Sequence, residues 1–213
     1  MPSVAQIDGL NIPGGAPAIT APVAAYSVRL LDSALGVPTY TGAAMRVRRE
    51  TAGGTGDDDE ADIAFDSGII SLDSAISNAS AGVTATTLGQ FINVGTVNGT
   101  TYTNPDSLTV TASCLVNTWY DQSGNGNDAE QTTQGSQPQI HDGTADTDLI
   151  LENGKPALQT DGNDYLSYTS ISFASDFCFV NVQTHERTKT GYGGGSGNFG
   201  ASFSVKCLLR FIL

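Results

Sequence analysis

The stretch WYDQSGNGNDA, residues 119–129, places an aromatic pair directly before a run of polar residues and glycine. Its glycines permit a positive φ angle, and its asparagines tolerate one better than most residues do. Its aspartate, serine and asparagine side chains can hydrogen-bond to nearby backbone amides and hold a turn. The stretch is therefore predicted to be a structural turn that leads one strand into the next. The residues assigned to this turn are Asp121, Ser123, Gly124, Asn125, Gly126, Asn127 and Asp128.

Three oxygen-bearing side chains of this stretch are also compatible with a binding or catalytic role. Asp121, Asn125 and Asp128 offer the hard oxygen ligands that calcium prefers, so they are candidates for a calcium site. The EF-hand ligand pattern with its closing glutamate is absent from the stretch. The same polar side chains are also compatible with a sugar contact or with a catalytic loop. No cofactor besides calcium is indicated.

Strand patterns surround the turn on both sides. Residues 107–121 contain an apolar run that is typical of a buried strand. Residues 44–50 and 177–186 alternate between two side-chain faces, as strands with one buried face do. An Asn-Gly pair in residues 96–103 stands at a hairpin-turn position. Because no long segment has a period of 3.6 residues, the sequence predicts an all-β sandwich of many short strands.

Composition divides the chain into three parts. Residues 1–22 are rich in proline, glycine and alanine, which predicts an extended N-terminal arm. Residues 23–186 carry the strand patterns and form the predicted sandwich domain. Residues 187–213 combine a glycine-rich loop with an apolar C-terminal tail. The arm and the tail are expected to lie against neighbouring molecules, through self-association or through contact with other proteins.

The charge of the chain argues against two classes of partner. The 213 residues carry a formal net charge of −13, and an acidic surface repels nucleic-acid phosphates and anionic lipids. Neither nucleic acid nor a membrane is therefore an expected partner. The three cysteines have no Cys-x-x-Cys spacing and do not cluster with histidines, so no zinc site is predicted. The N-terminus lacks the basic and apolar regions of a secretory signal.

Four of the nine basic residues are arginines in the first quarter of the chain, namely Arg29, Arg46, Arg48 and Arg49. An alternating strand places Arg46 and Arg48 on the same face. They are predicted to pair with carboxylates such as Asp121 or Asp62. A bidentate, partly buried pair with Asp121 would hold the turn. A basic groove for an anionic glycan is the alternative.

Three aromatic side chains are candidates for stacking on sugar rings. Tyr165 and Tyr168 stand beside a predicted turn, where their rings would be exposed. Trp119 follows a core strand, so its ring is also a candidate for the core. The predicted glycan-binding residues are Tyr165, Tyr168 and Trp119.

Two longer stretches carry a family resemblance. TWYDQSGNGNDAEQTTQGSQPQI (residues 118–140) and ENGKPALQTDGNDYL (residues 152–166) resemble a module of the catalytic domain of family 54 α-L-arabinofuranosidases. They also resemble virion and surface proteins of phages and marine bacteria. The similarity covers roughly residues 24–170. It implies a concanavalin-like jelly-roll β-sandwich, the fold shared by lectins and laminin-G domains, which agrees with the strand patterns.

The resemblance also raises an enzymatic alternative. Retaining glycosidases use two carboxyl groups about 5 Å apart, and in the arabinofuranosidases these lie downstream of the shared segment. This chain departs from the family after about residue 176, where its acidic residues are Asp176 and Glu186. No catalytic residue is therefore predicted, and the sandwich is expected to be incomplete at its C-terminus. An arabinofuranosidase-like glycoside hydrolase, or a fragment of one, is the alternative function.

These observations favour a non-enzymatic accessory protein of a phage particle, such as a head decoration, fibre or tail component. The expected partners are other virion proteins, reached through the arm and the tail, and surface glycans. The expected location is the virion, assembled in a host cytoplasm.

Overall fold

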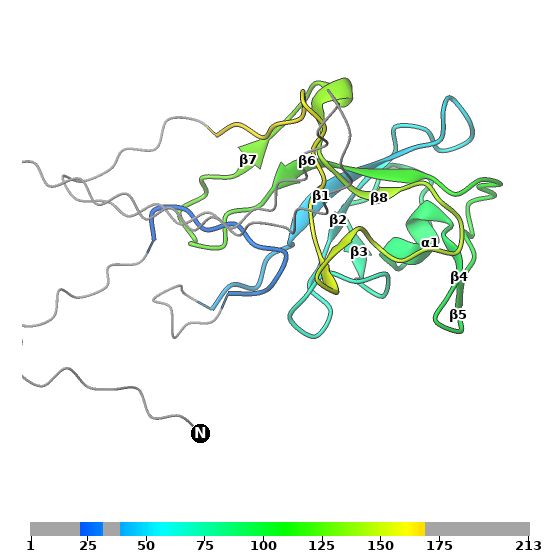
Figure 1. Cartoon of the computed structure of the whole chain (residues 1–213), viewed down its shortest axis with the longest axis horizontal. Helices are drawn as coiled ribbons and strands as arrows, with labels where there is room; N and C mark the ends of the chain where they lie inside the picture. Colours follow the sequence, from blue (N-terminus) through cyan, green and yellow to red (C-terminus); the bar gives the residue numbers. More distant parts are fainter. Residues whose placement is uncertain (1–21, 32–38, 169–213) are drawn as a thin grey trace, which may run out of the picture. The chain divides into compact units, whose positions relative to one another are not determined.

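The computed structural model describes residues 22–31 and 39–168, and strands make up most of its regular structure (Figure 1). Its elements are β1 (Met45–Glu50), β2 (Glu60–Ile63), β3 (Ile76–Ser77), α1 (Leu88–Ile92), β4 (Gly95–Val97), β5 (Thr100–Tyr102), β6 (Ser113–Trp119), β7 (Ala129–Glu130), the 3-10 turn η2 (Gln134–Ser136), β8 (Gln139–Asp142), β9 (Leu151–Glu152) and β10 (Lys155–Pro156). The paired strands are antiparallel. The structure is therefore all-β, as the sequence predicts, and the jelly-roll connectivity stays a prediction.

The largest sheet has the order β3-β2-β1-β6, with β7 and β8 both on the far side of β6. β7 pairs with the end of β6, where Trp119 lies opposite Ala129. β8 pairs with the beginning of β6, where Cys114 lies opposite His141. β7 and β8 are therefore two parts of one interrupted strand. Residues 132–137 leave this strand as a loop, which we call the arch.

Residues 157–168 lie along the outer side of the interrupted strand, and we call them the edge segment. Gln159 exchanges two backbone hydrogen bonds of 2.9 Å with Gln139. Ser167 does the same with Glu130, at 2.7 and 2.9 Å. The edge segment is therefore held at two points, one on either side of the arch.

The hydrophobic core joins one face of the sheet to helix α1. Met45, Val47 and Val116 of the sheet belong to the same buried cluster as Leu88 and Phe91 of the helix. Each of these five side chains is fully buried. Burial of such side chains stabilises a fold by about 1.5–3 kcal/mol each, so this cluster is the main support of the sheet.

Helix α1 is short because both of its ends are capped. The Thr87 side chain accepts a hydrogen bond from the Gln90 amide at the start, and Asn93 ends the helix in the left-handed conformation with a φ of 53°. Gly89 allows close packing, since an added Cβ would lie 2.5 Å from the ring of Tyr102. The helix therefore sits close against the β4–β5 hairpin.

Strand β1 carries buried arginines that are neutralised by the loop that follows it. Arg48 donates hydrogen bonds to the Gln137 side chain at 2.9 Å and to Asp58 at 2.7 Å. Arg49 donates to Asp59 at 2.6 Å. Both arginine side chains are 2% exposed. A buried cation needs such partners, so the acidic loop has a structural role.

The predicted ion pair between this strand and the turn is wrong. Arg46 pairs with Glu60 at 2.8 Å and with Asp62 at 3.0 Å, and Asp62 is one of the two partners expected for it. Neither Arg46 nor Arg48 forms an ion pair with Asp121. The neighbouring strand β2 supplies the carboxylates for Arg46, whereas Asp121 is occupied by other donors.

Several sequence predictions fall outside the described residues. These are the arm up to residue 21, the alternating segment 177–186, and the loop and tail of residues 187–213. Within the part of the chain that is described, no helix has the length and apolar character needed to cross a membrane.

Candidate functional site

The carboxylate of Asp121 organises the predicted turn. Its Oδ1 accepts hydrogen bonds from the backbone amides of Ala25 and Ser123, both at 2.8 Å. Its Oδ2 accepts from the Ser123 hydroxyl at 2.7 Å and from the Asn127 amide at 3.0 Å. A carboxylate has about four lone-pair positions, and these four donors occupy them. Asp121 is therefore a structural acceptor with no free position for a cation.

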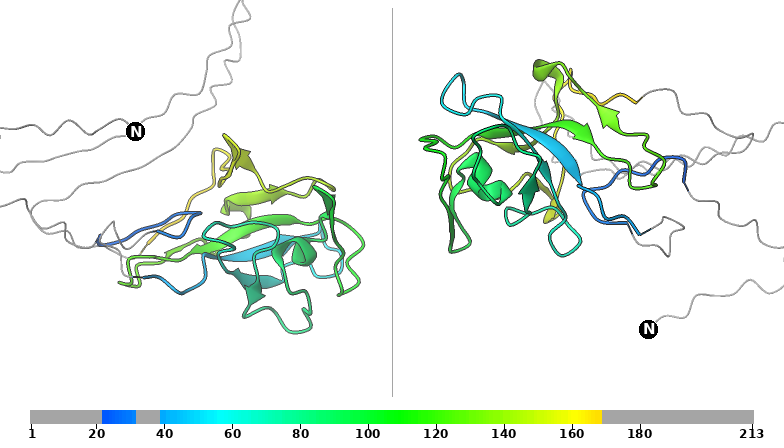
Figure 2. Two further views of the ribbon diagram at one scale, coloured as in Figure 1. Left: turned by 90° about the horizontal axis from the view of Figure 1, so that it is seen from below. Right: turned by 180° about the vertical axis from the view of Figure 1, so that it is seen from behind.

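The turn also binds the backbone of residues 22–31. The Asn125 amide group donates to the carbonyls of Pro22 and Val23, each at 3.0 Å, and the Asn127 amide group donates to Val23 at 2.7 Å. Figure 2 shows residues 22–31, in blue, running beside this turn. We call residues 121–127 the clasp, because their side chains hold a second segment of chain.

Gln122 is a clasp residue that no sequence pattern singles out. Its amide nitrogen donates to the carbonyls of Ser27 and Arg29, at 2.9 and 3.1 Å. Its amide oxygen accepts from the Leu31 backbone at 2.9 Å. The residue is fully buried. Its position after an aspartate in a polar run gives no signal of this role, because its partners lie more than 90 residues earlier.

Trp119 lies at the junction of the clasp and the core. Its ring is partly buried against the core, and its centroid lies 6.0 Å from that of Tyr26, with the planes tilted by 51°. Its indole N–H donates to the Ser27 carbonyl at 3.4 Å. The structure thus gives Trp119 contacts within the fold, to Tyr26 and to the backbone of Ser27.

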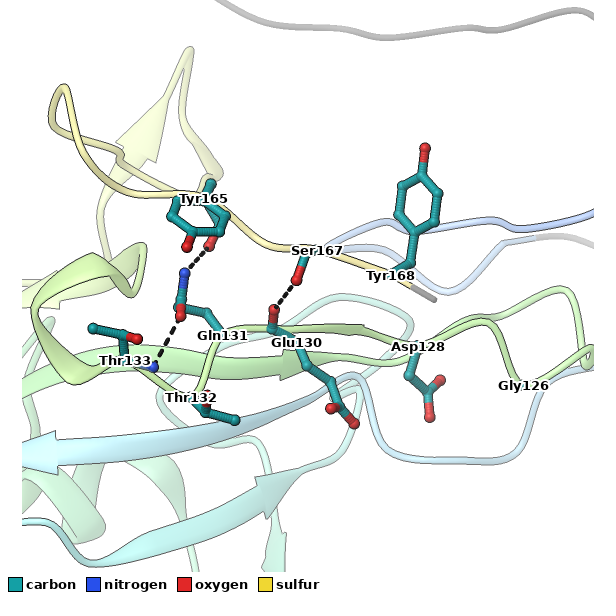
Figure 3. Close-up of a pocket in the computed structure, with 9 residues that line it drawn as sticks. All are labelled: Gly126, Asp128, Glu130, Gln131, Thr132, Thr133, Tyr165, Ser167 and Tyr168. Carbon is teal, nitrogen blue, oxygen red and sulfur yellow. Dashed lines mark hydrogen bonds between the residues drawn. The ribbon is translucent and has the colours of Figure 1, made fainter. Parts of the chain in front are cut away.

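A pocket of about 500 Å³ opens beside the clasp, between β7, the arch and the edge segment (Figure 3). Its lining is mainly polar and consists of Gly126, Asp128, Glu130, Gln131, Thr132, Thr133, Tyr165, Ser167 and Tyr168. Tyr165 and Tyr168 are 55% and 49% exposed. The pocket therefore brings these two predicted residues together with turn residue Asp128.

The backbone around the two tyrosines is held while their rings stay exposed. The Tyr165 amide donates to the Ser136 carbonyl at 3.1 Å, and its carbonyl accepts from the Gln131 side chain at 3.3 Å. Ser167, between the tyrosines, forms the paired backbone bonds to Glu130. When a ligand binds, a fixed backbone removes the cost of ordering this segment, and only the rotamers of the two rings remain to be fixed.

Two carboxylates also line the pocket. Asp128 and Glu130 are two residues apart on an extended chain, a spacing that places side chains on the same side. Figure 3 shows both carboxylates pointing to one side, with the Tyr168 ring pointing to the other. The sequence does not predict this pair, because the resemblance places the catalytic carboxyls of the family downstream of the shared segment. The acidic residues of this chain there, Asp176 and Glu186, are not predicted to be catalytic and lie outside the described residues.

A second hollow, of about 240 Å³, lies on the other side of the arch. The described residues around it include Leu115, Gln139 and Gln159, and none of its lining residues is aromatic. Of these two pockets, only the first is lined by exposed aromatic rings that could stack on a sugar.

Metal-binding groups are not clustered in residues 22–31 and 39–168, where no set of three or more His, Cys, Asp or Glu side chains is placed to hold an ion. Of the calcium candidates, Asp121 has its lone pairs occupied, and Asp128 accepts a hydrogen bond from the Asp121 amide at 2.8 Å. The Asn125 amide nitrogen is bonded to residues 22 and 23. These three side chains therefore serve the turn.

Comparison with known proteins gives no match to a family model, to a curated protein or to a solved structure. The resemblance to the family 54 arabinofuranosidases and to phage virion proteins therefore stays a prediction.

Proposed function

We propose that this chain is a non-enzymatic carbohydrate-binding module that serves as an accessory protein of a phage particle. The observation that carries the proposal is the pair of exposed tyrosine rings, Tyr165 and Tyr168, at the edge of an open polar pocket. A tyrosine ring offers an apolar face for sugar C–H groups and a hydroxyl for hydrogen bonding.

The polarity of the pocket suits a ligand with many hydroxyl groups. Pockets for drug-like molecules are mostly apolar, with a few placed polar groups. Here the hydroxyl-bearing residues Thr132 and Thr133 are among the lining residues. Hydroxyls can both donate and accept hydrogen bonds, which matches the alternating donors and acceptors of a sugar.

Glycan binding can be tested with two tyrosine variants of the full chain. Tyr165→Ala and Tyr168→Ala are each expected to weaken binding about tenfold, since loss of a stacking ring costs on the order of 1.4 kcal/mol. Binding is measured on a glycan array and then by calorimetry. Val110→Ala is the matched control, because Val110 is 47% exposed and does not line the pocket. Full affinity in both tyrosine variants would contradict the proposal.

The proposed place in a phage particle is supported by the resemblance of residues 118–140 and 152–166 to virion proteins, which is an inference by analogy. It predicts that purified particles contain this chain in a fixed ratio to their other proteins. Mass spectrometry of the particles checks this. Absence of the chain from particles made in cells that express it would reject this part of the proposal.

A glycoside hydrolase is the second candidate, favoured by the Asp128 and Glu130 carboxylates on one side of the pocket. Against it, Glu130 is exposed, and Asp128 is tied to the turn by the Asp121 amide. Glycosidases enclose their acid in an apolar environment. Release of arabinose from an arabinofuranoside by the wild-type protein, abolished in Glu130→Gln, would establish this second function.

A further inference from the structure

We propose that two copies of this chain associate by exchanging residues 22–31, so that the segment of one copy docks in the clasp of the other. We call residues 22–31 the guest segment. The inference concerns an interaction surface and does not depend on the proposed carbohydrate binding. It follows from the contacts that hold the guest segment among the described residues.

The clasp recognises the main chain of the guest segment. Asp121 accepts a hydrogen bond from the Ala25 amide at 2.8 Å, and the Gln122 amide donates to the Ala25 carbonyl at 2.8 Å. At the end of the segment, the Gln122 side chain accepts from the Leu31 amide at 2.9 Å. The carbonyls at its start are held by the clasp asparagines. Main-chain contacts of this kind also give affinity in peptide recognition by strand addition, where a separate chain supplies the segment.

Two side chains of the guest segment point inward and give the site its specificity. The Tyr26 ring lies 6.0 Å from the Trp119 ring, its phenol donates to a carbonyl of the clasp, and Val28 packs against the hydrophobic core. By contrast, Val23 and Leu30 are each 39% exposed. A second copy of the chain offers the same two inward side chains at the same spacing. It therefore fits the site better than a peptide of another sequence.

Exchange preserves the contacts of the guest segment. Outside the segment itself, its hydrogen-bond partners among the described residues lie in residues 68–70 and 119–127. An identical segment from another copy meets the same partners, so a reciprocal dimer contains as many of these bonds as two monomers. The monomer is then favoured by attachment alone, which gives the segment an effective concentration on the order of mM. Dimers therefore become populated when chains fold near this concentration, which is why domain exchange is a low-cost route to dimers.

The exchange can be tested with the full chain in two isotopic forms, one light and one labelled with heavy nitrogen. Equal amounts are mixed in urea, refolded at about 10 µM or about 1 mM, diluted and measured by native mass spectrometry. Dimers are expected after folding at the higher concentration, and half of them are expected to contain one light and one heavy chain. The dimer fraction is expected to be at least about tenfold lower after folding at the lower concentration. Chains concentrated together without urea are expected to reach the same ratio more slowly.

A synthetic peptide of residues 22–31 tests whether the clasp is the docking site. Added at about twice the chain concentration during folding, it is expected to lower the dimer fraction about threefold, because it competes for the clasp. Methylation of its Ala25 nitrogen removes the donor to Asp121 and is expected to weaken this competition at least about tenfold, since a hydrogen bond to a charged group is lost. Methylation of its Ala24 nitrogen, which donates to no described residue, is the matched control and is expected to preserve the competition.

Three results would overturn the proposal. Monomers alone after folding at about 1 mM would reject the exchange. Dimers that the unmodified peptide does not reduce would show that the copies meet at another surface. Equal competition by the two methylated peptides would reject recognition of the main chain at Asp121. None of these results bears on glycan binding, which the tyrosine variants test separately.

Discussion

At the scale of single residues, Gln122 shows how one side chain joins two distant segments. Its amide bonds to Ser27, Arg29 and Leu31 while the residue itself is fully buried. Buried polar groups that lose their partner are costly, so amides of this kind are hard to replace. This residue explains why a polar run forms part of the interior.

Gln122→Ala is expected to lower the free energy of unfolding by about 1–3 kcal/mol, because it removes three partly buried hydrogen bonds to the backbone of Ser27, Arg29 and Leu31. Urea denaturation checks the value. Gln134→Ala, an exposed glutamine of the arch, is the matched control and is expected to change stability by less than about 0.5 kcal/mol. Equal stability of the two variants would contradict the role assigned to Gln122.

His141 of β8 gives the protein a dependence on pH. The residue is 1% exposed, its Nδ1 accepts a hydrogen bond from the Gly143 amide at 3.1 Å, and its Nε2 lies 3.3 Å from the Thr147 hydroxyl. Burial lowers the pKa of His141, an effect that the nearby Asp142 and Asp148 partly offset. The folded protein therefore holds the ring neutral where the unfolded chain binds a proton.

Stability is consequently expected to be complete above the unfolded pKa of about 6.5 and to fall as the pH drops below it. Urea denaturation at about pH 7.5 and about pH 5.5 measures the difference. His141→Asn keeps an acceptor for the Gly143 amide and cannot take up the proton, so its stability is expected to change less between these pH values. A wild-type protein that is more stable at the lower pH would contradict the assignment.

At the scale of elements, the arch depends on one buried glutamine. Gln137 is 2% exposed, accepts from Arg48 at 2.9 Å and donates to the Gln131 carbonyl at 2.8 Å. It therefore closes the base of the arch and ties it to β1. The pocket shares Thr132 and Thr133 with this loop.

Gln137→Ala is expected to destabilise the protein by about 1–3 kcal/mol, since Arg48 and Gln131 each lose a buried partner. It is also expected to speed hydrogen exchange of the amides in residues 131–137 more than that of β1, as local opening would. Exchange measured by mass spectrometry separates these two regions. Equal acceleration of hydrogen exchange in residues 131–137 and in β1 would indicate that the arch does not open independently of the sheet.

The elements also show where sequence reasoning succeeds. The alternation in residues 44–50 predicts strand β1, and the Asn-Gly pair at Asn98 predicts the β4–β5 hairpin, where Asn98 and Gly99 have φ angles of 49° and 84°. Both signals are local, because strand period and turn chemistry depend on neighbouring residues. The position of Tyr165 and Tyr168 next to a turn likewise predicts their exposure.

Other contacts have no local signal. The sequence predicts an arginine partner for Asp121, yet its partners are amides and a hydroxyl from its own turn and from Ala25. The interruption between β7 and β8 depends on Gln137 and Arg48, which are 89 residues apart. A sequence shows which groups need partners, but the partners are chosen by the packing of distant segments.

At the scale of the whole molecule, the carboxylates of this acidic chain have more than one role. The net charge of −13 is borne by carboxylates, and two groups of them in the described part have different roles. Asp58, Asp59 and Asp62 neutralise arginines of β1, whereas Asp128 and Glu130 border the pocket. The same excess of acid thus neutralises buried arginines of the sheet and places two carboxylate residues at the pocket.

The clasp determines when residues 22–29 can dock during synthesis of the chain. Val23 and its partner Asn127 are 104 residues apart, so the segment leaves the ribosome well before the clasp is synthesised. At about 5–20 residues per second, this interval is roughly 5–20 s. For that time the carbonyls of residues 22–29 are solvated by water or held by other molecules. Docking of this segment is therefore a late event, and a nascent chain stalled before residue 121 lacks the side chains that retain it.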